Sequence, residues 1–118
     1  MAQPYFDRLT VKLRESNPPK AQSVAIECRH FFSGAALYAN GKIFASLTPA
    51  GFAIKLPEDS RSELLRARRG RRLRYFQEGP IKQEYVVLSR RTAGDRETVR
   101  ELLRAGIRYV HGVAPGRR

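Results

Sequence analysis

The sequence is poor in the residues that build redox and metal sites. Its 118 residues include one cysteine, one methionine, two histidines and no tryptophan. Cys28 has no second cysteine with which to form a disulfide in the chain, and zinc sites need three or four ligands. We therefore expect no metal and no cofactor. A lone cysteine is also typical of the reducing cytoplasm, where structural disulfides are rare.

Long apolar runs are missing as well. No stretch approaches the roughly 20 apolar residues that cross a bilayer. Residues 1–7 carry neither the basic start nor the apolar run of a signal peptide. We therefore expect a cytoplasmic protein with no membrane partner.

Acidic residues are scarce beside basic ones. The chain has 23 Lys and Arg against 11 Asp and Glu, a formal net charge of +12, and 18 of the 23 are arginine. Residues 61–91 carry a net +7, against +2 for residues 1–60 and +3 for residues 92–118. Such an excess attracts polyanions, and arginine favours bidentate phosphate contacts. The codon preference of a GC-rich genome would produce the same excess of arginine.

Hydrophobic periodicity predicts a small α+β domain. The expected helices span residues 4–16, 57–69 and 96 to about 110, and the expected strands span residues 23–32, 36–38, 42–47, 52–56, 72–76 and 84–89. The order helix, four strands, helix, two strands, helix predicts one two-layer domain over residues 1–111, with helices against an antiparallel sheet. Residues 112–118 have no packing pattern, so we expect a flexible basic tail.

Several residues mark where the elements should begin and end. Asn40-Gly41 between two strand-like runs is a strong signal for a β-hairpin. Ser60 and Glu63 have the spacing of a capping box, and Gly70 stands where a helix C-terminus favours glycine. Asp95 is placed to cap the last helix.

One segment resembles a known family. It reads Phe31-Phe32-Ser33-Gly34-Ala35-Ala36-Leu37-Tyr38, followed by Gly41 and Phe44. This is similar to the N-terminal domain of TfoX-type competence regulators, whose pattern is roughly Arg-Met-Phe-Gly-Gly-x-Gly-Leu-Tyr-x-x-Gly-x-x-Phe. Ser33 and Ala36 replace the first and third of the family's glycines. The positions that carry the resemblance, expected to be structural, are Phe32, Gly34, Tyr38, Gly41, Phe44, Lys55 and Tyr85.

The resemblance implies an α+β fold and a regulatory role connected with transcription. It covers about half of the chain, and the proline that usually follows the late family strand is replaced by Leu88-Ser89-Arg90-Arg91. We expect a stand-alone N-terminal-type domain without the second, helical domain of full-length regulators, so the roles that depend on that domain are not implied.

Catalytic constellations are poorly represented. His30 and His111 have no carboxylate and nucleophile nearby in sequence, and Ser33 is not in a Gly-x-Ser-x-Gly frame. Cys28 shares a strand face with His30, but free cysteine is most often a small buried hydrophobe. We therefore expect a protein that is not an enzyme.

The arginines are the main candidates for function. The hypothesis is a module that contacts nucleic-acid phosphates, with aromatic stacking beside them. Its candidate residues are Arg66, Arg68, Arg69, Arg71, Arg72, Arg74, Tyr75, Arg100 and Arg104. Two alternatives remain open: the arginines are simply solvated surface, or the domain is a protein-interaction or homodimerisation module that does not touch nucleic acid.

Overall fold

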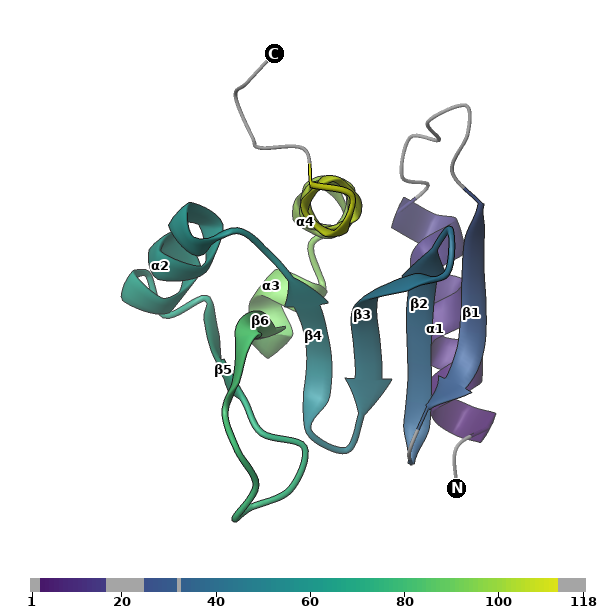
Figure 1. The fold of residues 1–118 in the computed structure, drawn as a ribbon, viewed down its shortest axis with the longest axis horizontal. Coiled ribbons are helices and arrows are strands. Elements are labelled where there is room, and N and C mark those ends of the chain that lie inside the picture. Colours follow the sequence, from purple (N-terminus) through teal and green to yellow (C-terminus); the bar gives the residue numbers. More distant parts are fainter. Residues whose placement is uncertain (1–2, 17–24, 32, 113–118) are drawn as a thin grey trace.

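A computed structural model describes residues 3–16, 25–31 and 33–112 (Figure 1). In chain order the elements are α1 (Gln3–Ser16), β1 (Ile26–Phe31), β2 (Gly34–Ala39), β3 (Lys42–Thr48), β4 (Gly51–Lys55), α2 (Glu58–Arg66), β5 (Gly70–Leu73), β6 (Lys82–Leu88), α3 (Arg90–Ala93) and α4 (Arg96–Val110). The strands form one antiparallel sheet in the order β1-β2-β3-β4-β6-β5. The predicted α+β class and the order of its elements are confirmed, with the four-residue α3 as an addition.

The hairpin between β2 and β3 turns where the sequence predicts. Asn40 and Gly41 both have positive φ, 49° and 84°, as a two-residue type I′ turn requires. The Asn40 side chain also accepts a hydrogen bond from the backbone N–H of Ala25, at 2.8 Å. The turn therefore holds the start of β1 as well as the two strands that it joins.

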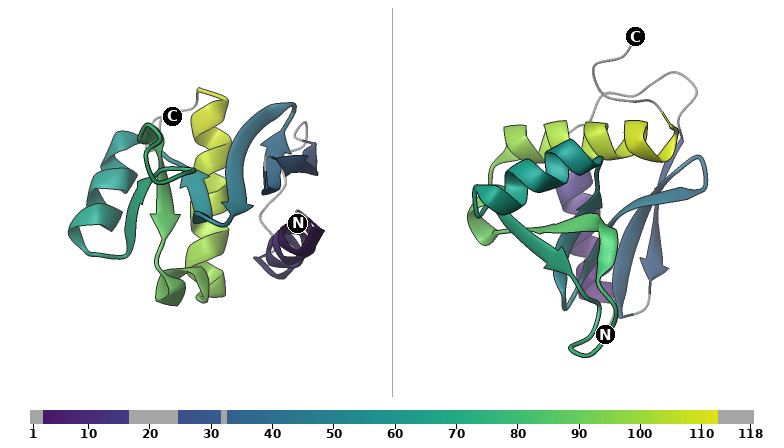
Figure 2. Two further views of the ribbon diagram at one scale, coloured as in Figure 1. Left: turned by 90° about the horizontal axis from the view of Figure 1, so that it is seen from below. Right: turned by 60° about the vertical axis from the view of Figure 1, so that its left-hand side comes forward.

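Helices α1 and α4 cover one face of the sheet. Figure 1 shows α4 end-on and α1 lengthwise, and the two helices cross steeply (Figure 2). Leu9 of α1 and Leu103 of α4 are fully buried in the main core. Leu37, Ala45 and Ile54 supply the sheet side of this core, and they lie side by side on β2, β3 and β4. Alternation along the strands sends their neighbours to the opposite face.

That opposite face carries a second, smaller core. Ala53, Leu73, Tyr85 and Val87 are buried there, with Tyr75 packed against them. Because β4, β5 and β6 contribute all four buried residues, this cluster holds the β5–β6 hairpin against the rest of the sheet. The helices that cover the main core leave this face open.

The boundaries around α2 differ from the prediction. The helix begins after Pro57, which provides no side-chain cap, so the Ser60–Glu63 capping box does not form. The helix ends at Arg66, and Arg68 takes the left-handed conformation, with φ of 59°. Gly70 does not cap the helix but begins β5, where it pairs with Leu88.

Some expectations concern residues that the structure does not describe. Phe32 and residues 113–118 of the expected tail lie outside the described residues. Among the helices that are described, none is both long and apolar enough to span a membrane.

Candidate functional site

The arginines of residues 66–74 follow one edge of the molecule. They run from the end of α2, along the edge strand β5 and into the β5–β6 loop. All six arginine side chains, Arg66, Arg68, Arg69, Arg71, Arg72 and Arg74, are exposed. Arg71 pairs with Val87 and Arg72 with Val86, so the two adjacent arginines point to opposite faces of the sheet. The segment is therefore a basic edge and not a flat patch.

Two of these arginines donate hydrogen bonds to backbone carbonyls. Arg71 donates to the carbonyl of Ala50 at 2.8 Å, which ties β5 to the β3–β4 turn. Arg74 donates to the carbonyl of Gly79 at 3.1 Å, within the β5–β6 loop. A guanidinium has five N–H donors, so both side chains keep further donors for a ligand.

The other predicted arginines belong to a different element. Arg100 and Arg104 lie on α4, which packs on β3 and β4, whereas β5 lies beyond β6 at the sheet edge. Arg104 is exposed, and the half-buried Arg100 has a buried Nε without a hydrogen-bond partner among the described residues. The structure thus joins Arg66 to Arg74 in one continuous edge and places Arg100 and Arg104 separately from it.

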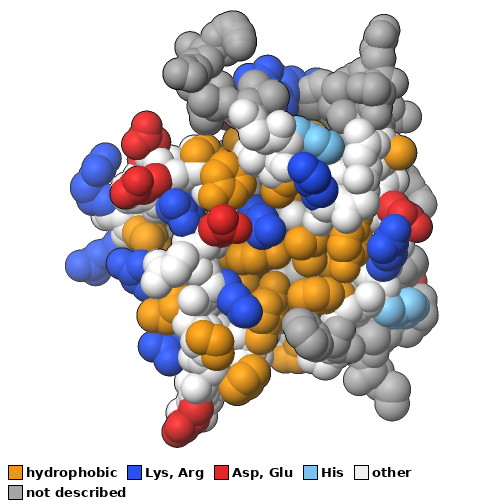
Figure 3. Space-filling view, viewed as in Figure 1, with side chains coloured by type: hydrophobic (Ala, Val, Ile, Leu, Met, Phe, Trp, Pro, Cys, Tyr) orange, Lys and Arg blue, Asp and Glu red, His pale blue; other side chains and the backbone are white. Residues whose placement is uncertain are grey.

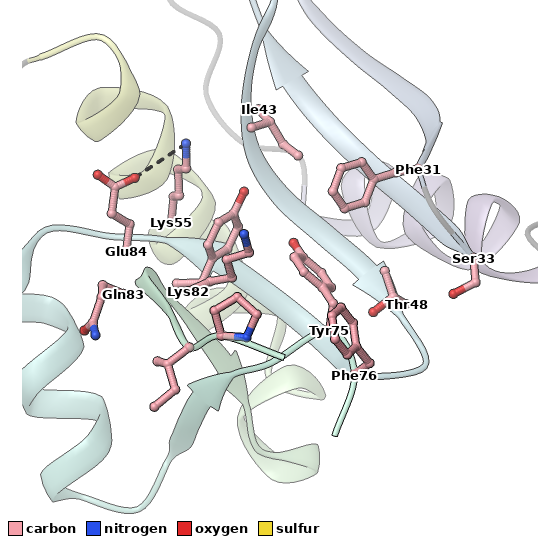
Figure 4. Close-up of a pocket in the computed structure, with 13 residues that line it drawn as sticks. Phe31, Ser33, Ile43, Thr48, Lys55, Tyr75, Phe76, Lys82, Gln83 and Glu84 are labelled. Carbon is pink, nitrogen blue, oxygen red and sulfur yellow. Dashed lines mark ion pairs between the residues drawn. The ribbon is translucent and has the colours of Figure 1, made fainter. Parts of the chain in front are cut away.

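The open face of the sheet contains a cleft that the sequence did not indicate. Its volume is about 950 Å³, and Figure 4 shows the side chains that line it. The lining residues are Phe31, Ser33, Ile43, Thr48, Lys55, Tyr75, Phe76, Pro80, Ile81, Lys82, Gln83, Glu84 and Tyr85. The space-filling view shows hydrophobic side chains gathered on this face, with basic and fewer acidic side chains around them (Figure 3). Of the residues predicted to bind nucleic acid, only Tyr75 lines the cleft. Lys55 and Tyr85 line it too, although the sequence predicted a structural role for them.

Three aromatic rings form the inner wall of the cleft. The ring centroids of Phe31 and Tyr75 are 5.6 Å apart, with an interplanar angle of 67°. Those of Tyr75 and Tyr85 are 6.4 Å apart, with an angle of 71°. Edge-to-face contacts of this kind are favourable beyond the area that they bury. Phe31, Tyr75 and Tyr85 therefore form a fixed aromatic wall built from β1, the β5–β6 loop and β6.

Phe76 lies at the mouth of the cleft and is 66% exposed. Its ring packs over Gly79, where a Cβ atom would come within 2.9 Å of the ring. A turn holds the two residues together, since the Gly79 N–H donates to the Phe76 carbonyl at 2.9 Å. The turn thus fixes the backbone of Phe76, and its exposed ring lies over Gly79 beside the aromatic wall.

Charged side chains lie along the side of the cleft formed by β4 and β6. Lys55 pairs with Glu84 at 3.6 Å, and its Nζ is 5.7 Å from the centroid of the Tyr85 ring. Glu84 also accepts a hydrogen bond from the Tyr109 hydroxyl at 3.2 Å. Lys82 is exposed on the same side. Two lysines against one glutamate leave a small positive excess on this side of the cleft.

Burial keeps the cleft tyrosines neutral. It raises the pKa of Tyr85, with the neighbouring Tyr75 adding to the effect. It also raises the pKa of Tyr75, although the hydrogen bond with Ser46 acts in the opposite direction. Both phenols therefore keep their protons at neutral pH, and neither supplies an anionic base.

The geometry offers little for catalysis or for a metal. Cys28 lies beside Thr10, whose hydroxyl donates to its Sγ at 3.7 Å, and burial raises the pKa of the thiol. A raised pKa makes the reactive thiolate scarce. Cys28 is half-buried and packs against the main core, whereas His30 on the same strand is exposed. Within the described ranges, no three His, Cys, Asp or Glu residues are grouped as a metal site would need.

Comparison with known protein families shows the family to which the chain belongs. A family model described as the TfoX N-terminal domain matches residues 20–109. The chain belongs to the TfoX N-terminal domain family. No curated protein and no solved structure matches it. The TfoX N-terminal domain family is regulatory or competence-related, and it is not a known enzyme family.

The residues that carry the TfoX resemblance fall into two groups. Gly34 and Phe44 belong to the packing of the sheet: a Cβ atom at Gly34 would come within 2.1 Å of the Leu47 carbonyl oxygen, and Phe44 is fully buried. Tyr38 is half-buried, and the Arg29 guanidinium lies 4.6 Å from the centroid of its ring. These residues shape the first hairpin.

The second group lines the cleft. Lys55 and Tyr85 are register partners on β4 and β6, and both side chains face the cleft. Because they stand 30 residues apart in sequence, no local pattern relates them. The one local signal for the cleft is the Tyr75-Phe76 pair after the arginine run, and the sequence-based hypothesis included only Tyr75 of this pair.

Proposed function

We propose that this member of the TfoX N-terminal domain family is a non-enzymatic regulatory module that binds nucleic acid. Contacts to phosphates would be made by the arginines of residues 66–74. The observation that carries the proposal is that all six guanidinium groups are exposed along one continuous edge that contains no acidic residue.

The chemistry of arginine fits this role. Its planar fork matches the oxygens of a phosphate and stays charged at any physiological pH. Arg66, Arg68 and Arg69 follow one another at the end of α2 and before β5, so their charges are close together along the chain. Phosphate contacts of this kind give binding with little sequence preference.

One feature favours the alternative of a protein-interaction module. In the part of the chain that the structure describes, β1 forms the other edge of the sheet, and an edge strand is where a partner strand can add to a sheet. Such a module would form a dimer whose stability is insensitive to salt. Light scattering at two salt concentrations distinguishes it from a monomer that binds nucleic acid.

The test is a salt titration of nucleic-acid binding by fluorescence anisotropy. The variant replaces Arg66, Arg68, Arg69 and Arg72 with glutamine. The control replaces four exposed arginines elsewhere, Arg8, Arg91, Arg96 and Arg108, with glutamine, so both variants lose the same charge.

The proposal predicts different effects on the salt slope. For duplex DNA, the slope of log K against log[salt] should fall by about 0.9 for each phosphate that the protein no longer neutralises. We expect this fall in the first variant and a smaller one in the control. Equal decreases in both variants would show that only net charge matters, and absence of binding at low salt would overturn the proposal.

A further inference from the structure

We propose that the cleft on the open face of the sheet receives unstacked bases of single-stranded nucleic acid, with Phe76 as a stacking platform. This inference rests on the proposed function and adds to it a site and a preferred form of ligand. The arginines of residues 66–74 would hold the backbone, and the cleft would distinguish a single strand from a duplex.

The first argument is the rigidity of the rings. Tyr75 is held by ring contacts to Phe31 and Tyr85 and by its hydroxyl, which lies 3.1 Å from that of Ser46. The backbone of Phe76 is held by a turn, and its ring lies over Gly79. Aromatic groups that are fixed before binding lose little conformational entropy when a base stacks on them.

The second argument is size and accessibility. A volume of about 950 Å³ lies at the upper end of the range for small-molecule sites, so it has room for a flat base. Phe76 presents most of its ring to solvent, so the ring is accessible to a base at the cleft. Bases in a duplex are stacked inside the helix, whereas those of a single strand can turn outward and stack on aromatic side chains.

The third argument is charge. Lys55 and Lys82 lie on one side of the cleft, and Arg74 belongs to the same loop as Tyr75 and Phe76. A backbone that follows the arginine edge therefore reaches the cleft beside Arg74, on a path where Glu78 and Glu84 are the acidic side chains. Basic and aromatic groups side by side suit bases joined by phosphates better than they suit an uncharged apolar peptide.

The experiment compares three labelled probes of about 15 nucleotides: an oligothymidine, an abasic oligomer with the same backbone, and a duplex. The variant is Phe76→Ala, which removes an exposed ring and should leave the fold intact. The control is Val11→Ala, because Val11 is the other large hydrophobic side chain found exposed in the described residues, at 44%. Circular dichroism checks that both variants fold.

The expected result is specific to bases. Wild-type protein should bind oligothymidine more tightly than the abasic oligomer. Phe76→Ala should weaken binding of oligothymidine by at least about fivefold, the lower bound for removing one base–aromatic stack. Binding of the duplex and of the abasic oligomer should not change, and Val11→Ala should behave as wild type.

A second variant gives a fluorescence signal for base stacking at the cleft. The chain contains no tryptophan, so Phe76→Trp introduces one indole at the mouth of the cleft. Its fluorescence should be quenched by oligothymidine and not by the abasic oligomer, with affinity retained.

Three results would overturn the inference. Equal affinity for oligothymidine and the abasic oligomer, with no effect of Phe76→Ala, would show that the protein binds phosphates but that the cleft does not bind bases. Self-association abolished by Phe76→Ala would show that a second copy of the chain fills the cleft. Absence of binding to all three probes at low salt would remove the proposed function together with this inference.

Discussion

The hydroxyl oxygens of Tyr75 and Ser46 lie 3.1 Å apart and join the β5–β6 loop to the middle of β3. Ser46 is fully buried beneath the loop, and Tyr75 is half-buried. This contact fixes the Tyr75 ring between Phe31 and Tyr85, so the inner wall of the cleft depends on it. A polar link between two segments 29 residues apart is thus part of the cleft's architecture.

The first prediction concerns this link. Tyr75→Phe should lower the free energy of unfolding by about 1 kcal/mol, because it leaves the buried Ser46 hydroxyl without this partner. Urea denaturation measures the effect. Ser46→Ala in the Tyr75→Phe background should add less than it costs alone, since the hydrogen bond between the two hydroxyls is already absent there. Strictly additive effects would contradict the link.

The second prediction concerns the close contact between β2 and β3. Gly34→Ala should lower the free energy of unfolding by about 3 kcal/mol or more, because the new Cβ would lie 2.1 Å from the Leu47 carbonyl oxygen and 2.8 Å from the Thr48 Cα. Both neighbours are backbone, so the strands themselves would have to separate. Thermal and urea denaturation measure the destabilisation.

Gly94→Ala is the matched control for Gly34→Ala. A Cβ atom at Gly94 would meet the nearest carbonyl oxygens at 3.5 and 3.6 Å, an ordinary contact, and the residue has a right-handed helical φ of −87°. Its stability should be unchanged or raised by up to about 1 kcal/mol, since alanine restricts the unfolded chain. A similar large destabilisation in both variants would contradict a specific clash at Gly34.

Local signals predicted the parts of the fold that local chemistry determines. Asn40-Gly41 specified its turn because few other residue pairs adopt two positive φ angles, and Asp95 specified the start of α4. The end of α2 was predicted wrongly because Gly70 suggested a cap. In the structure Arg68 makes the turn, and the backbone of Gly70 pairs with Leu88, a contact that depends on residues far along the chain.

The candidate site shows more strongly the same difference between features that local sequence determines and features that depend on contacts between distant residues. The arginine edge is contiguous in sequence, so composition alone located it. The cleft draws Phe31, Ile43, Tyr75 and Tyr85 from four separate segments. Their common location follows from the register of the sheet and from the path of one loop, which no local pattern records. The sequence by itself therefore indicated the basic edge and one of the aromatic residues, Tyr75, but not the cleft that the other rings complete.

The third prediction concerns alkaline pH. The folded state raises the pKa of Tyr85 above its ordinary value of 10.0, so this phenol keeps its proton when the unfolded chain has already lost it. The corresponding stability is present below about pH 10 and is lost as the pH rises above that value. The free energy of unfolding should therefore fall from about pH 10 upward.

Tyr85→Phe isolates this contribution. The variant should reduce the slope of unfolding free energy against pH above about pH 10 by up to about 1.4 kcal/mol per pH unit, the value for one proton. Below that pH the slope should match the wild type. Urea denaturation at several pH values measures it, with ultraviolet absorbance to follow the ionisation of the tyrosines. Identical slopes in the two proteins would contradict a raised pKa.

The last prediction concerns the start of α4, the helix that covers the main core. The Asp95 carboxylate accepts hydrogen bonds from the Glu97 N–H at 3.2 Å and the Thr98 hydroxyl at 3.0 Å. Asp95→Ala should lower the free energy of unfolding by about 1 kcal/mol, the usual cost of removing an N-cap. Asp59→Ala is the control, because Asp59 lies in the first turn of α2 without a capping bond and should change stability by less than about 0.5 kcal/mol. Equal destabilisation of the two variants on urea denaturation would show that the effect comes from the helix dipole alone.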